Sequence, residues 1–340
     1  MRTLASIGRP GLIGARLPAG APGPFIQRGF GAVSSLLSPP PQPAAYNSAA
    51  AVAVRFERFL RNIALTDAQF ADGETKLRTV TSCLNRAYWG HNDENLNRVL
   101  AGSWSKQTRV RPPRDIDMLF VLPYAVYARY EQRAGNKQSQ LLQEIRGFLL
   151  QVSPRTEMSG DGQVVLVKFD SYAVEVAPAF LLDNYKQYWI CDTNNGGRYK
   201  VADPAAEVSS IEFADKGTIG NVRRLTRMMK KWQKYCNVPL KSFWIELLAA
   251  DFLRQWQYRA QGHAFHDWMV RDFLTFLLGR RFTYLTVPGT FELIWLGDKW
   301  YSKAVTAYRR AMKACDLEYE ACPYLARDEW QGIFGPDFQG

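Results

Sequence analysis

The segment Gly102–Leu122 decides the fold, and it reads GSWSKQTRVRPPRDIDMLFVL. Its apolar second half predicts a strand over residues 115–122, with Asp115 and Asp117 at the start of the strand. Residues i and i+2 of a strand point to the same face, so the two carboxylates project together while Ile116 turns into the core. Neighbouring carboxylates repel each other unless a cation lies between them, and hard oxygen ligands suit Mg²⁺. An Asp-x-Asp pair by itself favours a competing interpretation, an exposed strand start with two solvated acids.

Two further features favour a metal and phosphate site. Gly102 and Ser103 form a turn upstream of the acids, where a glycine lets a phosphate approach backbone N–H groups closely. Glu175 lies between Val174 and Val176, in a strand otherwise suited to burial. A buried carboxylate needs a partner, so Glu175 is a candidate third metal ligand. Three carboxylates can hold two metal ions about 4 Å apart, which activate a hydroxyl and stabilise a leaving pyrophosphate.

The composition is that of a globular protein with a basic surface. The chain has 340 residues, of which 47% are hydrophobic and 22% charged, and its net charge is +11. This balance favours polyanionic partners or phosphate-bearing substrates and does not determine the fold. The five cysteines form no Cys-x-x-Cys motif, so we expect reduced thiols in a cytoplasmic protein. Three histidines are too few for a His-rich zinc site, and no apolar run reaches the roughly 18 residues that span a bilayer.

Residues 1–50 differ from the rest of the chain. They contain four arginines, no acidic residue and eight of the 18 prolines. Little apolar periodicity is available there to offset the entropy of ordering, so we expect a disordered tail. An Arg-rich terminus without acids also resembles an organelle transit peptide, and a flexible tail is the simpler interpretation.

The remaining residues fall into a mixed half and a helical half. Helical spacing predicts helices over 51–66, 67–90, 92–98, 124–131 and 137–149. Two β-rich runs predict a hairpin of residues 164–169 and 172–177, whose second strand ends at Pro178. Further helices are predicted over 219–235, 243–253, 267–278 and 303–319. We therefore expect an α+β fold with a catalytic lobe over 51–215, including the N-terminal helix, and a helical lobe over 216–340.

These patterns resemble a known group of enzymes. A Gly-Ser turn, an Asp-x-Asp strand start and a third acid on a later strand are similar to the polymerase β-type nucleotidyltransferase superfamily. Downstream, the segments are GGRYKVADP at 196–204, RLTRMMKKW at 224–232 and KSFWIELL at 241–248. With residues 300–338 they resemble bacterial CD-NTases, the SMODS-type relatives of cyclic GMP-AMP synthase that serve antiphage CBASS systems. The resemblance covers about residues 50–338, and it implies a polymerase β-like lobe with a mixed sheet, packed on a C-terminal helical lobe like that of oligoadenylate synthase.

The resemblance also implies a catalytic centre. Asp115 and Asp117 would bind two Mg²⁺ ions, or Mn²⁺ in their place, and Glu175 would complete the second site. Many relatives have aspartate at this third position, and glutamate is one methylene longer. The rest of the catalytic work would be positioning and neutralisation of charge.

A second set of residues is implied in nucleotide binding. It comprises Gly102 and Ser103 at the donor triphosphate, Thr108 in the same loop, Lys230, Ser242 and Asp298. Lys231 competes with Lys230 for the phosphate, because a helix turns by about 100° per residue and only one of the two can face the cleft. Asp298 has an alternative role as a cap of the following helix. Tyr199 is equally suited to stacking on a base and to the core.

The implied function is a nucleotidyltransferase that joins nucleoside triphosphates, ATP among them, into a cyclic di- or trinucleotide second messenger. The implied partners are a downstream effector and a regulatory protein, with no membrane and no sequence-specific nucleic acid. One alternative is a template-independent transferase that acts on RNA ends, which would need an RNA-binding domain or a long basic stripe. A second alternative is a catalytically silent sensor of the same fold, and the presence of all three acids argues against it.

Overall fold

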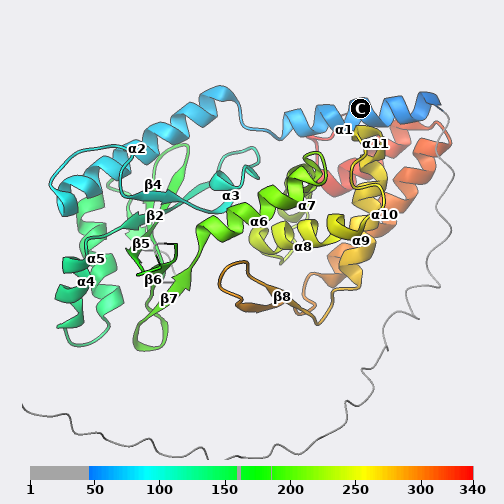
Figure 1. The fold of residues 1–340 in the computed structure, drawn as a ribbon. Helices are drawn as coiled ribbons and strands as arrows, with labels where there is room; N and C mark the ends of the chain where they lie inside the picture. Colours follow the sequence, from blue (N-terminus) through cyan, green and yellow to red (C-terminus); the bar gives the residue numbers. More distant parts are fainter. Residues whose placement is uncertain (1–45, 159–161, 185, 340) are drawn as a thin grey trace, which may run out of the picture. The chain divides into compact units, whose positions relative to one another are not determined.

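Helices and strands are mixed as far as residue 202, and helices dominate the rest of the chain (Figure 1). This computed structural model describes residues 46–158, 162–184 and 186–339, which all belong to one structural unit. The first part contains α1 (Tyr46–Asn62), α2 (Asp67–Trp89), β1 (Arg98–Leu100), α3 (Gly102–Ser105), β2 (Asp115–Val121), α4 (Tyr124–Glu131), α5 (Lys137–Leu149), β3 (Glu157–Met158), β4 (Val165–Lys168), β5 (Ala173–Leu181), β6 (Tyr188–Asp192) and β7 (Arg198–Ala202). The second part contains α6 (Pro204–Lys216), α7 (Asn221–Tyr235), α8 (Ser242–Gln255), α9 (His266–Leu278), β8 (Tyr284–Thr286), β9 (Leu293–Trp295), α10 (Tyr301–Tyr319) and α11 (Pro323–Phe334).

The first part is built on one mixed sheet. Its strand order is β1-β2-β5-β4-β3, and β6 and β7 extend it from β5. The central pair, β2 and β5, is parallel, whereas the other pairs are antiparallel. The expected α+β fold with a mixed sheet is therefore confirmed, and so is the hairpin of β4 and β5.

The sheet buries one face against helices and leaves the acids on the other. Ile116, Met118 and Phe120 are buried and pack with side chains of α2 and α5 in one hydrophobic cluster, which we call the sheet core. Asp115 and Asp117 occupy alternate positions of β2, where Asp115 is exposed and Asp117 is half-buried, while Leu119 farther along the same face is buried. The period of two along the strand therefore separates the core from the acidic positions, as predicted.

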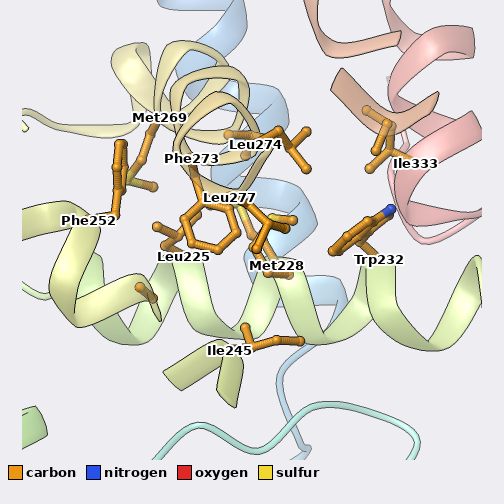
Figure 2. Packing of buried hydrophobic residues seen from close by; sticks show 14 of the residues in the cluster. Leu225, Met228, Trp232, Ile245, Phe252, Met269, Phe273, Leu274, Leu277 and Ile333 are labelled. Carbon is orange, nitrogen blue, oxygen red and sulfur yellow. The ribbon is translucent and has the colours of Figure 1, made fainter. Parts of the chain in front are cut away.

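The helical part has a core of its own. Figure 2 shows Leu225 and Met228 of α7, Ile245 of α8 and Phe273 of α9 meeting there, and the cluster extends to α10 and α11. We call this cluster the helical core. The buried side chains of α1, such as Phe56, also belong to it, although the sequence-based division placed this helix with the catalytic lobe. The boundary between the lobes at residue 215 remains a prediction.

The predicted helix over 92–98 is wrong. These residues form turns that lead into β1. The carboxylate of Asp93 accepts hydrogen bonds from the backbone N–H groups of Asn95 and Leu96, at 2.7 and 2.8 Å. Asn97 has a left-handed φ of 62°. Aspartate and asparagine compete with helix formation in this way, because their short side chains satisfy nearby backbone groups.

Pro178 does not end its strand, because β5 continues to Leu181. The backbone of Ala179 bonds to β2, where its carbonyl accepts from Leu122, so the neighbouring position 178 faces the opposite edge. On that edge β4 pairs only as far as Val176, and β6 begins to pair at Ala179. Position 178 therefore lies between the stretch of β5 that pairs with β4 and the stretch that pairs with β6. Proline has no backbone N–H, and at this position the sheet loses no hydrogen bond because of it.

Two further expectations concern the ends of the chain and the membrane. The helix expected from residue 51 begins at Tyr46, and the predicted tail otherwise lies outside the described residues. No helix in the described ranges combines the length and the apolar character of a transmembrane segment.

Candidate active site

A cleft of about 550 Å³ lies between the acidic face of the sheet and the helices α6, α7 and α8. Its walls come from β2, from β5 and from the segment that follows β1 on one side, and from the three helices on the other. Eight of the nine residues selected from the sequence line it: Gly102, Ser103, Thr108, Asp115, Asp117, Glu175, Lys230 and Ser242.

The strand register brings the three acids together on one face. In the parallel pair, Asp117 lies opposite Glu175 and Asp115 lies opposite Ala173. Paired residues of neighbouring strands share a face, and so do residues two apart in one strand. The carboxylates of Asp115, Asp117 and Glu175 therefore belong to the same side of the sheet, facing the cleft.

The two acids of β2 have raised pKa values, although cations lie near them. Burial raises the pKa of Asp115, and the charge of Arg114 opposes this shift. Burial also raises the pKa of Asp117, as does the nearby charge of Asp115, while Lys106 and Lys230 act in the opposite direction. A cation between the two carboxylates would relieve both effects.

Gly102 is shaped by its contact with Asp117. Its φ of 56° is left-handed, and a Cβ at this position would collide with the Asp117 carboxylate. The preceding N–H, of Ala101, donates to the carbonyl of Asp117 at 3.0 Å, which fixes the loop against β2. Only glycine combines this conformation with the absence of a side chain, so the backbone can pass directly over the acid.

A buried carboxylate ties the loop after Gly102 to the helices. Glu246 on α8 is 2% exposed, and its Oε1 accepts from the Thr108 hydroxyl and from Lys230 Nζ, both at 2.6 Å. Its Oε2 lies 2.9 Å from Lys106 Nζ, which also donates to Glu207 of α6 at 2.8 Å. Burial alone would raise the pKa of Glu246, but the charges of Lys230 and Lys106 outweigh it and lower the pKa to about 2. We call Lys106, Thr108, Lys230 and Glu246 the loop clamp.

Lys230 and Lys231 point in different directions. Lys230 lines the cleft, whereas Lys231 forms an ion pair with Asp337. Lys230 is nevertheless engaged: its ammonium contacts Glu246 Oε1, Thr108 Oγ1 at 2.9 Å and the Thr108 carbonyl at 3.3 Å. An ammonium has three N–H donors, so these contacts account for all of them.

The remaining predicted positions differ in their placement. Ser242 lies at the start of α8 and is exposed, and its hydroxyl donates to Gln233 at 3.3 Å. Asp298 is absent from the cleft lining, and it does not cap α10 with its side chain, because the N-cap is Trp300 and has no side-chain bond. Tyr199 stacks on Trp189 at the edge of the sheet core, outside the cleft lining.

The acids suit Mg²⁺ that is bound together with a phosphate. Among the described residues, no three side chains of His, Cys, Asp or Glu form a preassembled metal cage. Mg²⁺ seldom needs one, because one or two carboxylates usually hold it with substrate phosphates and water. Asp115 and Asp117 offer such a pair, with raised pKa values that a cation would lower, and Glu175 stands opposite Asp117 in the register.

Sequence reasoning missed several residues of the cleft, namely Lys106, Arg114, Lys234, Glu207 and Glu246. Two of them had a signal. Glu246 follows Ser242 by four residues, the predicted helix over 243–253 begins directly after Ser242, and i, i+4 positions of a helix share a face. Lys234 follows Lys230 by the same spacing. Lys106 had none, because nothing local indicates that a lysine in a loop is buried.

Comparison with known proteins finds a matching domain family for part of the chain. The sequence profile described as Second Messenger Oligonucleotide or Dinucleotide Synthetase domain matches residues 51–213. The comparison with curated proteins gives no match.

Several solved structures share the fold. CdnC of E. coli MS115-1, in a complex with HORMA-deltaN, is 16% identical and has a TM-score of 0.60 over 85% of this chain and 98% of that chain. Vibrio cholerae DncV, a cyclic AMP-GMP synthase with a bound linear intermediate, is 12% identical, with a TM-score of 0.59 over 86% and 88% of the two chains. The CdnE c-di-GMP synthase of Capnocytophaga granulosa is 12% identical, with a TM-score of 0.54 over 81% and 84%.

At these identities the structural similarity establishes the fold, including the expected helical lobe beside the catalytic lobe. The profile match over residues 51–213 favours the synthetase over the RNA-end transferase and over the silent sensor. Residues 51–213 match the Second Messenger Oligonucleotide or Dinucleotide Synthetase domain, and together with the shared fold this match supports a nucleotidyltransferase of the CD-NTase group.

Proposed function

We propose that the cleft joins nucleoside triphosphates, ATP among them, by nucleotidyl transfer with release of pyrophosphate, and then closes the product into a cyclic di- or trinucleotide. The observation that carries this proposal is the convergence of Asp115, Asp117 and Glu175 on one sheet face, directly beside the Gly102 loop. Three acids and a glycine loop in one cleft supply both requirements of the reaction, cation binding and close approach of a phosphate.

Related nucleotidyltransferases depend on metal ions in general. For this chain we propose two Mg²⁺ ions, with Asp115 and Asp117 as ligands of both and Glu175 as a ligand of the second. Such ions, when bound, lower the pKa of an attacking hydroxyl and stabilise the leaving pyrophosphate.

The protein's own contribution is positioning. The Gly102 backbone passes over Asp117 and would hold the donor triphosphate next to the acids, with Ser103 as its neighbour in the loop. Thr108 keeps that loop in place through its hydrogen bond to Glu246. Ser242 lines the helical side of the cleft, where its exposed hydroxyl would exchange its hydrogen bond to Gln233 for one to a nucleotide. Asp298 has no place in this proposal.

The proposal extends to partners and location. The cyclic product would act on a downstream effector in antiviral signalling. CdnC is structurally similar and was solved with HORMA-deltaN, which supports a regulatory protein for this chain as well. All five cysteines are free, as in proteins of reducing compartments, which supports a cytoplasmic reaction.

The test of the transfer step is pyrophosphate release. Purified protein is incubated with the four nucleoside triphosphates and Mg²⁺, beside the double variant Asp115→Ala plus Asp117→Ala. We expect release by the wild type and its loss, by at least about 1,000-fold, in the double variant, because electrostatic stabilisation of the transition state is usually the largest catalytic term. Asp170→Ala, an exposed acid outside the cleft lining, is the matched control and should retain full activity. Equal release by the double variant would show that these acids are not the catalytic centre.

A further inference from the structure

The cations of the cleft differ in whether they are free to bind a ligand. Five of them line it: Lys106, Arg109, Arg114, Lys230 and Lys234. Substrate phosphates need donors that are not already used by the protein, because a phosphate oxygen competes for the same N–H groups. The partners of each cation therefore decide which of them can hold a phosphate.

Three of the five are engaged. Lys230 has an acceptor for each of its three N–H groups in Glu246 and Thr108. Lys106 is 1% exposed and lies between Glu207 and Glu246. Arg109 donates to the Trp104 carbonyl at 2.7 Å, and its guanidinium lies 4.9 Å from the centre of the Trp104 ring. These side chains hold the loop and the helices together.

Arg114 and Lys234 stand apart from this pattern. Across the described part of the chain, neither side chain forms a hydrogen bond or an ion pair. Lys234 lies one turn after Lys230 on α7 and is half-exposed in the cleft wall, while Arg114 immediately precedes Asp115. The two like charges sense each other, because burial and then Arg114 lower the pKa of Lys234.

The one acid that opposes this shift is not available as a partner in the described structure, because Asp337 is ion-paired with Lys231. Lys234 has no ion-pair partner within the described ranges, and Arg114 acts on the neighbouring Asp115 without forming an ion pair with it, so both cations can attract an anion. Both cations line the cleft that also holds the acids of β2, where the triphosphate of a substrate would lie.

We propose that Lys234 and Arg114 bind the phosphates of the nucleoside triphosphate directly, whereas Lys230 and Lys106 act from within the loop clamp. This inference rests on the proposed function, and it replaces the phosphate contact that the sequence assigned to Lys230. A lysine supplies a point charge and an arginine a planar fork, so the pair suits a polyphosphate with several oxygens.

The test measures affinity rather than turnover. Inorganic tripolyphosphate and ATP are titrated calorimetrically into the purified full chain with Mg²⁺, and adenosine serves as a probe without phosphates. We expect Lys234→Met to weaken the binding of tripolyphosphate and ATP by at least about tenfold, since a bond to a charged group is lost. Arg114→Met should act in the same direction. Adenosine binding and the melting temperature should stay unchanged, because the Lys234 side chain forms no hydrogen bond or ion pair within the described ranges.

Two controls separate this role from others. Lys216→Met removes one positive charge from the exposed end of α6, outside the cleft lining, and should leave all affinities as they are. Lys230→Met should lower the melting temperature as well as the affinity, because it breaks the loop clamp.

The outcomes distinguish this inference from the proposed function. If the wild type releases pyrophosphate and Lys234→Met binds tripolyphosphate as tightly as the wild type does, the inference is overturned and the proposed function is not. A wild type that binds tripolyphosphate through Lys234 and forms no product overturns the proposed function alone. A wild type that does not bind tripolyphosphate with Mg²⁺ overturns the inference.

Discussion

At the scale of single residues, the site depends on one glycine. Gly102 holds a left-handed φ and brings its backbone against the Asp117 carboxylate, so conformation and space are both restricted at this position. A left-handed φ alone costs a residue with a side chain roughly 1–2 kcal/mol, which a protein of this size can tolerate. The collision with the acid has a different consequence, because it moves a group that would bind metal.

We predict that Gly102→Ala abolishes most activity while the protein still folds. Pyrophosphate release should fall by at least about 100-fold, since small displacements of reacting groups have effects of this size. The matched control is Gly90→Ala, because Gly90 also has a left-handed φ, of 73°, and has nothing within 4 Å of the added Cβ. Both variants should lose similar stability in a thermal melt, and only Gly102→Ala should lose activity. Equal activity losses would mean that backbone strain, and not the contact with Asp117, is responsible.

The raised pKa values of Asp115 and Asp117 predict how metal binding depends on pH. Mg²⁺ binds the ionised carboxylates, so its effect is complete above the raised pKa values and is lost as the pH falls through them. At pH 8, with a non-hydrolysable triphosphate analogue present, Mg²⁺ at ten times its Kd should add about 1.4 kcal/mol of stability. The Mg²⁺-dependent increase in melting temperature, measured from pH 8 to pH 5, should become smaller as the pH falls. This loss should begin at a higher pH than it would if the ligands were exposed aspartates with an ordinary pKa.

The variant Asp115→Asn plus Asp117→Asn serves as the comparison for this experiment. It should show no Mg²⁺-dependent shift at any pH, whereas Asp170→Asn should behave as the wild type. A shift of the same size in the double variant would place the metal elsewhere.

At the scale of elements, the loop clamp joins the loop after α3 to α7 and α8. Glu246 is the common partner of Thr108, Lys230 and Lys106, which come from both sides of the cleft. Removing one member of a buried ion pair leaves the other charges buried without a partner. The free energy of unfolding then falls by more than the net stabilisation that the pair supplies.

We predict that Glu246→Gln destabilises the protein by about 3 kcal/mol and also weakens ATP binding. Glu318→Gln is the matched control, because it breaks a buried ion pair with Arg55 in the helical part, away from the cleft lining. Denaturant unfolding should show a loss for both variants, and calorimetry should show weaker ATP binding for Glu246→Gln alone. Since the pKa of Glu246 is lowered to about 2, its contribution should stay constant from pH 8 to pH 5 and be lost only toward pH 2. Normal ATP affinity in Glu246→Gln would exclude a role of the clamp in positioning the loop.

Local pattern predicted the elements well where it was strong. The ranges 124–131 and 137–149 agree with α4 and α5, and the four later helices were each found within a few residues. Two predictions of secondary structure were wrong, and in each the cause is a local feature that the pattern of apolar residues does not reveal. Asp93 satisfies backbone groups that a helix would use, and Pro178 falls where no partner strand requires its N–H.

The acids could be predicted because their signal is also local, two carboxylates spaced by two in an apolar strand. The cations could not, since a lysine looks alike in the sequence whether it is engaged or free. Lys230 and Lys234 share one face of α7, and only the distant Thr108 and Glu246 distinguish them. Lys106 is buried through contacts to residues more than 100 positions away in the chain.

At the scale of the whole molecule, two cores support one cleft. The sheet core holds β2 and β5 in register, and the helical core holds α7 and α8, so each core fixes one wall. The family profile ends at residue 213, whereas the cleft also needs Lys230, Lys234 and Ser242 from beyond it. The helical part is therefore a component of the proposed active site.

The central claim is that this cleft makes a cyclic nucleotide, and the most direct measurement is the fate of its product under phosphatase. The full chain is incubated with labelled nucleoside triphosphates and Mg²⁺, treated with phosphatase, and the products are separated and weighed by mass spectrometry. The account predicts a phosphatase-resistant product with the mass of a closed di- or trinucleotide, absent from Asp115→Ala plus Asp117→Ala. Phosphatase-sensitive ladders, or products that form only when RNA is added, would contradict it.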